Sequence, residues 1–186
     1  MRPAMRSFDV EKKIILIGDP AVGKTSLIRR FVTDKFDDRY LMTIGMKATR
    51  KALELTFDPP GVRVLLNLSV WDILGQRGVE RAHTIYFRGA EAFILVFDGT
   101  RRDTFESISY WVERVRELCG PVPGMLVCNK VDLRSEFVVS AEELKGKAKQ
   151  LGVGSIATSA KSGENVERIF QQVGEVLCRP LAEGRA

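Results

Sequence analysis

One short motif constrains the fold of this chain more than any other feature. The segment from Gly18 to Thr25 reads GDPAVGKT and matches the pattern G-x-x-x-x-G-K-[ST]. It follows residues 12–17, a β-branched run typical of a buried strand. It precedes Thr25 to Val32, where apolar residues recur at helical spacing. A strand, a glycine-rich loop and a helix in this order predict a phosphate-binding loop.

The residue types in this loop suit a polyphosphate. Glycines let successive backbone N–H groups surround phosphate oxygens, and the helix N-terminus adds unpaired donors and the positive end of its dipole. We expect Lys24 to reach the β- and γ-phosphates and the Thr25 hydroxyl to bind Mg²⁺. The motif predicts a nucleoside triphosphate without identifying its base. The loop residues expected to bind the nucleotide are Asp19, Pro20, Ala21, Val22, Gly23, Lys24, Thr25 and Ser26.

Strand-like and helix-like segments alternate along the rest of the chain. We expect strands at residues 12–17, 46–57, 62–71, 92–97, 125–128 and 155–158, and helices at residues 25–32, 104–119 and 165–177. A further helix begins at the capping box of Ser140 and Glu143 and ends near Gly152. A turn at residues 58–61 joins two strands into an antiparallel hairpin. This order predicts an α/β fold: a single P-loop NTPase domain whose mostly parallel, doubly wound sheet has one antiparallel edge strand and helices on both faces.

The length and the charge distribution limit what else the chain can be. Its 186 residues are the usual size of one domain. We expect an N-terminal extension at 1–11, the nucleotide-binding domain at 12–178 and a short tail at 179–186. The net charge is +5, but basic and acidic residues are interspersed, so no nucleic-acid partner is expected.

The segment Asn129-Lys130-Val131-Asp132 follows the strand at 125–128, at the edge of the sheet where such folds bind ligands. A carboxylate there can accept two hydrogen bonds from the N1–H and 2-amino groups of guanine, and adenine has no such donor pair. We therefore expect Asp132 to select guanine and the aliphatic part of Lys130 to cover the ring.

A second polar segment ends the next strand in the same way. It reads Thr158-Ser159-Ala160-Lys161. The N–H of Ala160 could donate to guanine O6, and Lys161 could cover the other face of the base. The residues expected to bind the base are therefore Asn129, Lys130, Asp132, Ser159, Ala160 and Lys161.

Taken in order with Thr43 and the segment WDILGQ at 71–76, these motifs resemble those of the Ras superfamily of small GTPases. The Rab branch is the most similar, because YLMTIG at 40–45 and Trp71-Asp72 have its character. The resemblance extends from about Lys12 to Leu177. It implies that Thr43 completes the Mg²⁺ shell when the γ-phosphate is present, and that Asp72 holds Mg²⁺ through water.

The resemblance also implies the remaining roles. The N–H of Gly75 would contact the γ-phosphate, and Gln76 would orient the attacking water, so Gln76, Lys24 and Thr43 are the expected catalytic residues. The expected metal ligands are Thr25, Thr43 and Asp72. Phe36 matches an aromatic that packs against guanine, although it could equally be part of the core. Tyr40 matches an aromatic that closes over the phosphates.

The chain departs from the family pattern at several positions. Pro20 stands where the family has a small residue, Ile73-Leu74 replaces a Thr-Ala pair, and Arg77 replaces a glutamate. Arg77 could stabilise transition-state charge, but a solvated or partner-contacting arginine is the favoured interpretation. The single histidine, His83, is expected to lie at the surface or at an interface.

These observations favour a molecular switch that binds GTP or GDP with Mg²⁺ and hydrolyses GTP slowly. A protein exchange factor, an activating protein and an effector are its expected partners. Two alternatives remain open: a GTP-binding adaptor with little hydrolysis, and an ATP-using P-loop enzyme such as a small kinase. Asp132 argues against the second alternative.

The sequence also gives an expectation for location. The three cysteines show no pairing pattern, the N-terminal segment lacks the apolar run of a signal peptide, and the last residues do not form a C-a-a-X motif. We therefore expect a cytoplasmic protein with no direct lipid anchor.

Overall fold

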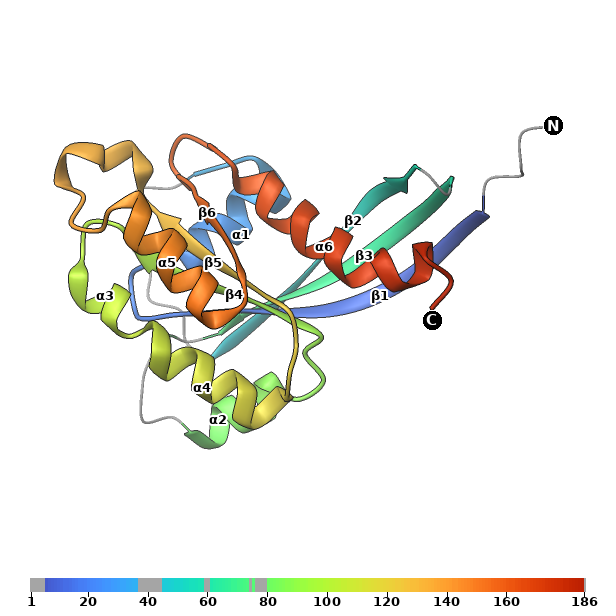
Figure 1. The fold of residues 1–186 in the computed structure, drawn as a ribbon, viewed down its shortest axis with the longest axis horizontal. Helices are drawn as coiled ribbons and strands as arrows, with labels where there is room; N and C mark the ends of the chain where they lie inside the picture. Colours follow the sequence, from blue (N-terminus) through green and yellow to red (C-terminus); the bar gives the residue numbers. More distant parts are fainter. Residues whose placement is uncertain (1–5, 37–44, 59–60, 74, 76–79, 186) are drawn as a thin grey trace.

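A six-stranded sheet forms the centre of the molecule, with helices on both faces (Figure 1). The computed structural model describes residues 6–36, 45–58, 61–73, 75 and 80–185. The strands are β1 (Arg6–Ile17), β2 (Met46–Phe57), β3 (Val62–Ile73), β4 (Ala92–Asp98), β5 (Gly124–Asn129) and β6 (Gly154–Ala157). The helices are α1 (Lys24–Thr33), α2 (Glu80–Phe87), α3 (Arg102–Glu106), α4 (Ile108–Cys119), α5 (Ala141–Leu151), α6 (Val166–Ala182) and the 3₁₀ helix η1 (Val131–Glu136).

The sheet has the order β2-β3-β1-β4-β5-β6. The hairpin partners β2 and β3 are antiparallel, and every other pairing is parallel. The predicted fold class, including the antiparallel edge strand, is confirmed. In the parallel part of the sheet, the carboxyl ends of the strands lie at one edge, where the predicted nucleotide-binding segments begin.

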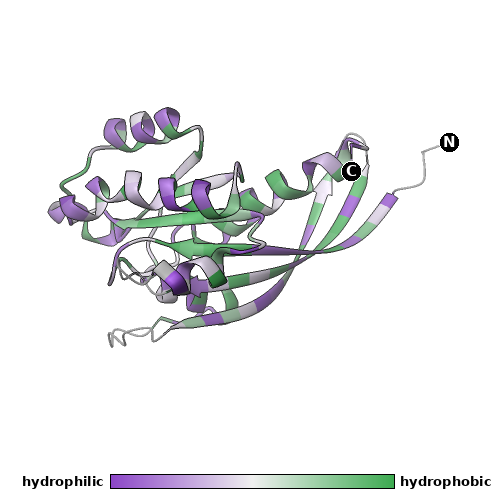
Figure 2. Cartoon of the chain, turned by 90° about the horizontal axis from the view of Figure 1, so that it is seen from below, coloured by the Kyte–Doolittle hydropathy of each residue, from purple (hydrophilic) through white to green (hydrophobic). Residues whose placement is uncertain are grey.

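Two hydrophobic clusters fill the space on either side of the sheet. Side chains from α1 and α6 cover one face, and side chains from α2, α4 and α5 cover the other. All seven residues of β4 are buried because both of its faces are covered. In β1, Ile14 and Leu16 belong to the first cluster, whereas Ile15 and Ile17 belong to the second. Figure 2 shows hydrophobic residues along the central strands and hydrophilic residues on the outer sides of the helices.

The first strand and the last helix are both longer than predicted. β1 begins at Arg6, so residues 6–11, expected to precede the domain, pair with β3. α6 continues to Ala182 with Pro180 inside its last turns, so the first half of the predicted tail is helical. The Arg6 guanidinium donates to the Ala182 carbonyl at 3.3 Å. The extended strands and the end of α6 project together from the body of the molecule (Figure 1).

The single helix predicted at 104–119 is divided into α3 and α4 at Ser107. Ser107 Oγ lies 2.8 Å from the carbonyl oxygen of Asp103, four residues back, and can share its proton with this carbonyl. Such a bond competes with the helical backbone bonds and bends a helix. The capping box of Ser140 and Glu143 is present at the start of α5, as predicted.

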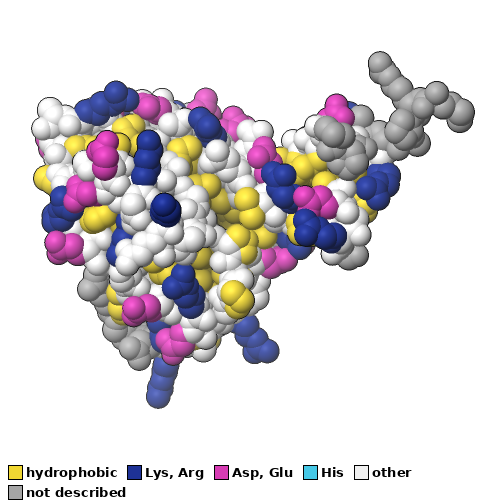
Figure 3. Space-filling model, in the orientation of Figure 1, with side chains coloured by type: hydrophobic (Ala, Val, Ile, Leu, Met, Phe, Trp, Pro, Cys, Tyr) yellow, Lys and Arg dark blue, Asp and Glu magenta, His cyan; other side chains and the backbone are white. Residues whose placement is uncertain are grey.

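The surface carries charges of both signs. On the face that Figure 3 presents, basic and acidic side chains alternate without a large patch of one sign. Among the helices within the described ranges, we find none with the length and apolar character that crossing a bilayer requires.

Candidate functional site

The loop between β1 and α1 folds around the amine of Lys24. Lys24 Nζ donates to the carbonyl oxygens of Gly18 at 2.7 Å and Asp19 at 2.9 Å. The side chain is buried, and this burial lowers the pKa of Lys24 to about 8, although the negative charges of Asp72 and Asp19 act to raise it. The amine is therefore held inside the loop by carbonyl groups, which the oxygens of an anion could replace.

A buried amide connects this loop with the two polar segments that were predicted to read the base. Asn129 Nδ2 donates to the Val22 carbonyl at 2.9 Å, and Asn129 Oδ1 accepts from the Ala160 N–H at 3.1 Å. Gly23 lies directly beside this amide with φ of 101°, and a Cβ atom at Gly23 would stand 2.2 Å from Asn129 Nδ2. Only glycine fits here, and its lack of a side chain lets the backbone of the loop lie directly against the Asn129 side chain.

The two polar segments also contact each other directly. Ser159 Oγ donates to Asp132 Oδ1 at 2.5 Å, and the Val131 N–H donates to the Thr158 carbonyl at 3.0 Å. Asp132 is exposed, whereas Ser159 and Ala160 are buried. The exposed carboxylate of Asp132 is thus held in place by contacts with the buried segment at 158–160. Lys161, the next residue, is exposed at the surface.

Thr25 and Asp72 meet at the first turn of α1. Thr25 Oγ1 donates to Asp72 Oδ2 at 2.5 Å, and the Asp72 side chain is buried. A hydroxyl and a carboxylate are hard oxygen ligands of the kind that Mg²⁺ prefers, so this pair fits the predicted ion. Across the described residues, no group of three or more His, Cys, Asp and Glu side chains could hold a metal ion by itself. The donor set therefore fits a magnesium ion that also binds phosphate and water.

Gly75 lies against the phosphate loop. A Cβ atom at Gly75 would stand 2.5 Å from both the Gly18 carbonyl oxygen and Lys24 Nζ, and 2.7 Å from the Asp19 carbonyl carbon. The backbone at Gly75 thus approaches the Lys24 amine more closely than a residue with a side chain could.

The carboxylate of Asp19 has a different environment from the one expected of a nucleotide-binding residue. It is buried, accepts from Trp111 Nε1 at 2.9 Å, and also accepts from the Ser107 hydroxyl. Its side chain is thus directed to α4, and its backbone carbonyl is the group that contacts Lys24. Asp19 attaches the loop to α4.

Three contacts of the site were not anticipated from the sequence. Arg101 Nη2 donates to the Pro20 carbonyl at 2.8 Å, and Lys130 Nζ lies 2.5 Å from Asp98 Oδ2. Arg30 Nε donates to the Ala160 carbonyl at 3.0 Å. Asp98 is the last residue of the buried strand β4 and Arg101 follows it, so their position at the carboxyl edge of the sheet was the signal that could have identified them.

Two ring-bearing residues, Phe36 and His83, contact the hydrophobic clusters. Phe36 is half-buried and packs against the cluster between α1, α6 and the sheet. His83 is buried, with its ring centroid 5.3 Å from that of Phe87 and 5.5 Å from that of Trp111, so the predicted surface position was wrong. The position of His83 is set by the helix α2, which the sequence pattern did not indicate.

Some residues to which the sequence gave a possible role in the site fall outside the described ranges. They are Tyr40, Thr43, Gln76 and Arg77. The roles given to these residues remain predictions.

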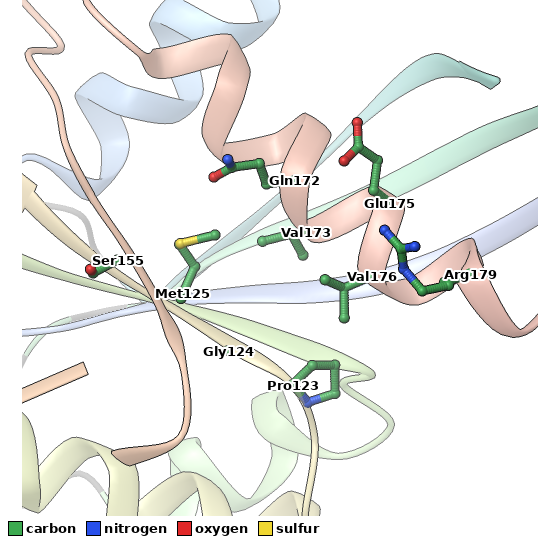
Figure 4. A pocket seen from close by; sticks show the side chains of 10 residues that line it. Pro123, Gly124, Met125, Ser155, Gln172, Val173, Glu175, Val176 and Arg179 are labelled. Carbon is green, nitrogen blue, oxygen red and sulfur yellow. The ribbon is translucent and has the colours of Figure 1, made fainter. Parts of the chain in front are cut away.

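A separate hollow lies at the opposite edge of the sheet. It is lined by residues such as Pro123, Met125, Ser155 and Val176, from the amino ends of β5 and β6 and from α6 (Figure 4). These residues differ from those predicted to bind the nucleotide, which lie at the carboxyl ends of the strands.

Comparison with known proteins identifies close relatives over most of the chain. The model of the Ras family matches residues 13–179. The chain is 37% identical to Ras-related protein Rab-1D of Dictyostelium discoideum, over 92% of this chain and 81% of the relative. It is 38% identical to Ras-related protein SEC4 of Saccharomyces cerevisiae, over 92% and 77%. It is 35% identical to Ras-related protein Rab-3 of Caenorhabditis elegans, over 96% and 79%.

Proposed function

Because this chain belongs to the Ras family and is a Rab-like small GTPase, a switch that binds GTP and GDP, we propose that its nucleotide lies along the carboxyl edge of the sheet, with the phosphates at Lys24 and the base at Asp132. The observation that carries this proposal is the buried Asn129, whose amide bonds both the phosphate loop and the Ala160 backbone. A single nucleotide can contact both segments only if they lie close together, and the two bonds of Asn129 hold them close.

The phosphates replace carbonyl groups as partners of the Lys24 amine. Lys24 Nζ is buried between Gly18 and Asp19 at 2.7 and 2.9 Å, and its pKa is lowered to about 8. The negative charge of a phosphate favours the protonated amine, so binding raises this pKa and strengthens the charge-assisted bonds. The first turn of α1 adds backbone donors to the same anion.

The base is recognised by groups that hold their positions before it arrives. Ser159 bonds one oxygen of the Asp132 carboxylate, and that carboxylate accepts from the N1–H and 2-amino groups of guanine. The Ala160 N–H already donates to Asn129 Oδ1, and O6 of the base shares this donor when the nucleotide is bound. Adenine offers no donor pair to Asp132, so the site discriminates against ATP.

Thr25, and Asp72 through water, would hold the magnesium ion, and Thr43 would join them when the γ-phosphate is bound. At this position, a bound ion would supply positive charge against the negative charge that develops on the phosphates during hydrolysis. Gln76 orients the attacking water, and the Gly75 N–H contacts the γ-phosphate. The close approach of Gly75 to Lys24 supports the second role. The protein contributes position and electrostatic stabilisation rather than covalent chemistry.

Intrinsic hydrolysis is slow, and a partner protein accelerates it. The segments that contain Thr43 and Gln76 change their contacts when the γ-phosphate leaves, which alters the surface that an effector recognises. An exchange factor restores the GTP-bound form. The cytoplasmic location expected from the sequence belongs to this proposal, and cell fractionation tests it.

A purified sample tests the nucleotide and its conversion. Denaturing the protein and identifying the released nucleotide by chromatography should yield GDP or GTP. Single-turnover incubation with GTP should then release phosphate over minutes to hours. GTP that persists unchanged through many hours would favour the adaptor, and ATP that displaces GDP at similar concentration would refute guanine selection.

A substitution tests the base contact separately. Asp132→Asn replaces one acceptor with a donor, which suits the 2-oxo group of xanthine rather than the 2-amino group of guanine. We expect GDP affinity to fall and affinity for xanthosine diphosphate to rise. Glu136→Gln removes a neighbouring exposed carboxylate of η1 and should change neither affinity.

A further inference from the structure

Arg101 connects the carboxyl end of β4 with the phosphate loop. Its Nε lies 3.2 Å from Asp98 Oδ2, and its Nη2 donates to the Pro20 carbonyl at 2.8 Å. The guanidinium is planar and its donors have fixed directions, so two bonds at different nitrogens determine its orientation. The Pro20 carbonyl is therefore bound by a group that the sheet itself positions.

The orientation of this carbonyl also determines the direction of the next amide. In a trans peptide, the carbonyl of one residue and the N–H of the following residue point to opposite sides. The Ala21 N–H thus points away from Arg101. Pro20 has no N–H of its own, so the loop has one donor fewer to offer a phosphate than a loop with another residue there. The direction of the Ala21 amide is correspondingly more important.

The backbone at Ala21 needs this support. Its φ is 62°, in the left-handed region that residues with a side chain rarely adopt. Such a conformation persists only where surrounding contacts enforce it. The bond from Arg101 acts on the peptide group immediately before this residue.

Asp98 provides the anchor for Arg101. Its side chain is 1% exposed, and it accepts from the Thr100 N–H at 3.0 Å and the Thr100 hydroxyl at 2.7 Å. Although burial opposes ionisation, the bonds from Lys130 and Thr100 hold the pKa of this carboxyl below its usual value. Lys130, predicted to cover the base, shares Oδ2 with Arg101. One ionised carboxylate therefore holds a residue from each half of the site.

We propose that Arg101 is a positioning residue that directs the Ala21 amide toward the phosphates beyond the α-phosphate, so that it selectively favours guanosine diphosphate and triphosphate over the monophosphate. This inference rests on the proposed location of the nucleotide. It assigns Arg101 no contact with the reacting atoms, because its action passes through the Pro20–Ala21 peptide.

The test compares GDP with GMP as competitors against a fluorescent GDP analogue. Loss of one hydrogen bond to a charged group corresponds to about a tenfold change or more. Arg101→Ala should therefore raise the Kd for GDP about tenfold relative to the wild type while changing the Kd for GMP less than about twofold. Arg101→Lys, which keeps the charge but cannot make both bonds, should give an intermediate loss.

Arg102→Ala is the matched control. Arg102 is an exposed neighbour that bonds Glu143 and the Val138 carbonyl rather than the phosphate loop. It should leave both affinities unchanged. If Arg101→Ala fails to fold by circular dichroism, the comparison passes to Arg101→Lys, for which a selective loss of GDP affinity is still expected.

Each result decides between stated alternatives. Equal losses for GDP and GMP would overturn the inference, because they would indicate a general structural role for Arg101. Unchanged GDP affinity in the Arg101 variants would also overturn it. A wild-type protein that binds neither GDP nor GTP would refute the proposed function instead, independently of Arg101.

Discussion

The buried amide of Asn129 gives the sharpest prediction about how this site is built. Replacing Asn129 with alanine removes the donor to the Val22 carbonyl and the acceptor of the Ala160 N–H. Both bonds lie in the interior, since Asn129, Val22 and Ala160 are each at most 2% exposed. The variant should therefore lose stability and loosen the connection between the phosphate loop and the base-reading segment.

The magnitude follows from the two groups left behind. A buried backbone group deprived of its partner costs about 1–3 kcal/mol. Two such groups give a loss of about 2–4 kcal/mol in the free energy of unfolding, allowing for some relief by entering water. For a domain of this size, that corresponds to a lower Tm by about 4–16 °C.

Two measurements examine this variant. Urea unfolding of the GDP-bound protein, followed by circular dichroism, gives the change in the free energy of unfolding. Stopped-flow release of a fluorescent GDP analogue gives the dissociation rate, which should rise because both ends of the nucleotide depend on the same amide. Asn67→Ala is a suitable control, because Asn67 Nδ2 makes an exposed bond with Asp9 and should matter by less than about 0.5 kcal/mol.

The reasoning would be refuted by an Asn129→Ala protein that unfolds within about 1 kcal/mol of the wild type. Such a result would mean that the Val22 carbonyl and the Ala160 N–H find other partners without cost. An unchanged GDP dissociation rate in a destabilised variant would instead show that Asn129 stabilises the fold without helping to hold the nucleotide. That result would contradict the claim that this amide joins the two halves of the nucleotide-binding edge.

Three further predictions concern backbone strain, pH and the attachment of the loop. Ala21→Gly should stabilise the protein by about 0.5 kcal/mol in thermal unfolding, because relief of the φ of 62° exceeds the added freedom of the unfolded chain. Burial lowers the folded-state pKa of Lys24 from 10.5 to about 8. Between pH 8 and 10.5 the unfolded chain therefore binds a proton that the folded chain has lost. In the nucleotide-free protein this group therefore adds stability as pH rises from 8 to 10.5, whereas GDP affinity should fall up to about tenfold per pH unit above 8. Calorimetric titration with GDP at several pH values checks this trend, and a steep slope that persists in Lys24→Met would contradict it. Trp111→Phe removes the N–H that donates to Asp19 at 2.9 Å and should cost about 1–3 kcal/mol in urea unfolding, whereas Trp71→Phe, whose indole bonds Ser69 within its own strand, should cost less.

Local patterns predicted most of the elements because each has a short-range physical cause. The strand-like segments at 46–57 and 62–71 and the turn signal between them predicted the hairpin. The observed bounds of β2, Met46 and Phe57, agree with the prediction. The capping box at Ser140 gave the start of α5, since both of its bonds form within four residues. Residues 6–11 were not recognised as strand, because their charged residues mask the alternation and their partner β3 lies far along the chain.

The sequence by itself determined the α/β order, the phosphate loop and the identity of the residues expected to read guanine, because these depend on local spacing and on the donors and acceptors of single side chains. Only the tertiary structure decided that Asp19 attaches the loop to α4, that His83 is buried beside Trp111, and that Arg101 binds the Pro20 carbonyl. Each of these contacts joins segments that are far apart in the sequence, so its geometry depends on how strands and helices pack. No pattern within a few neighbouring residues contains that information.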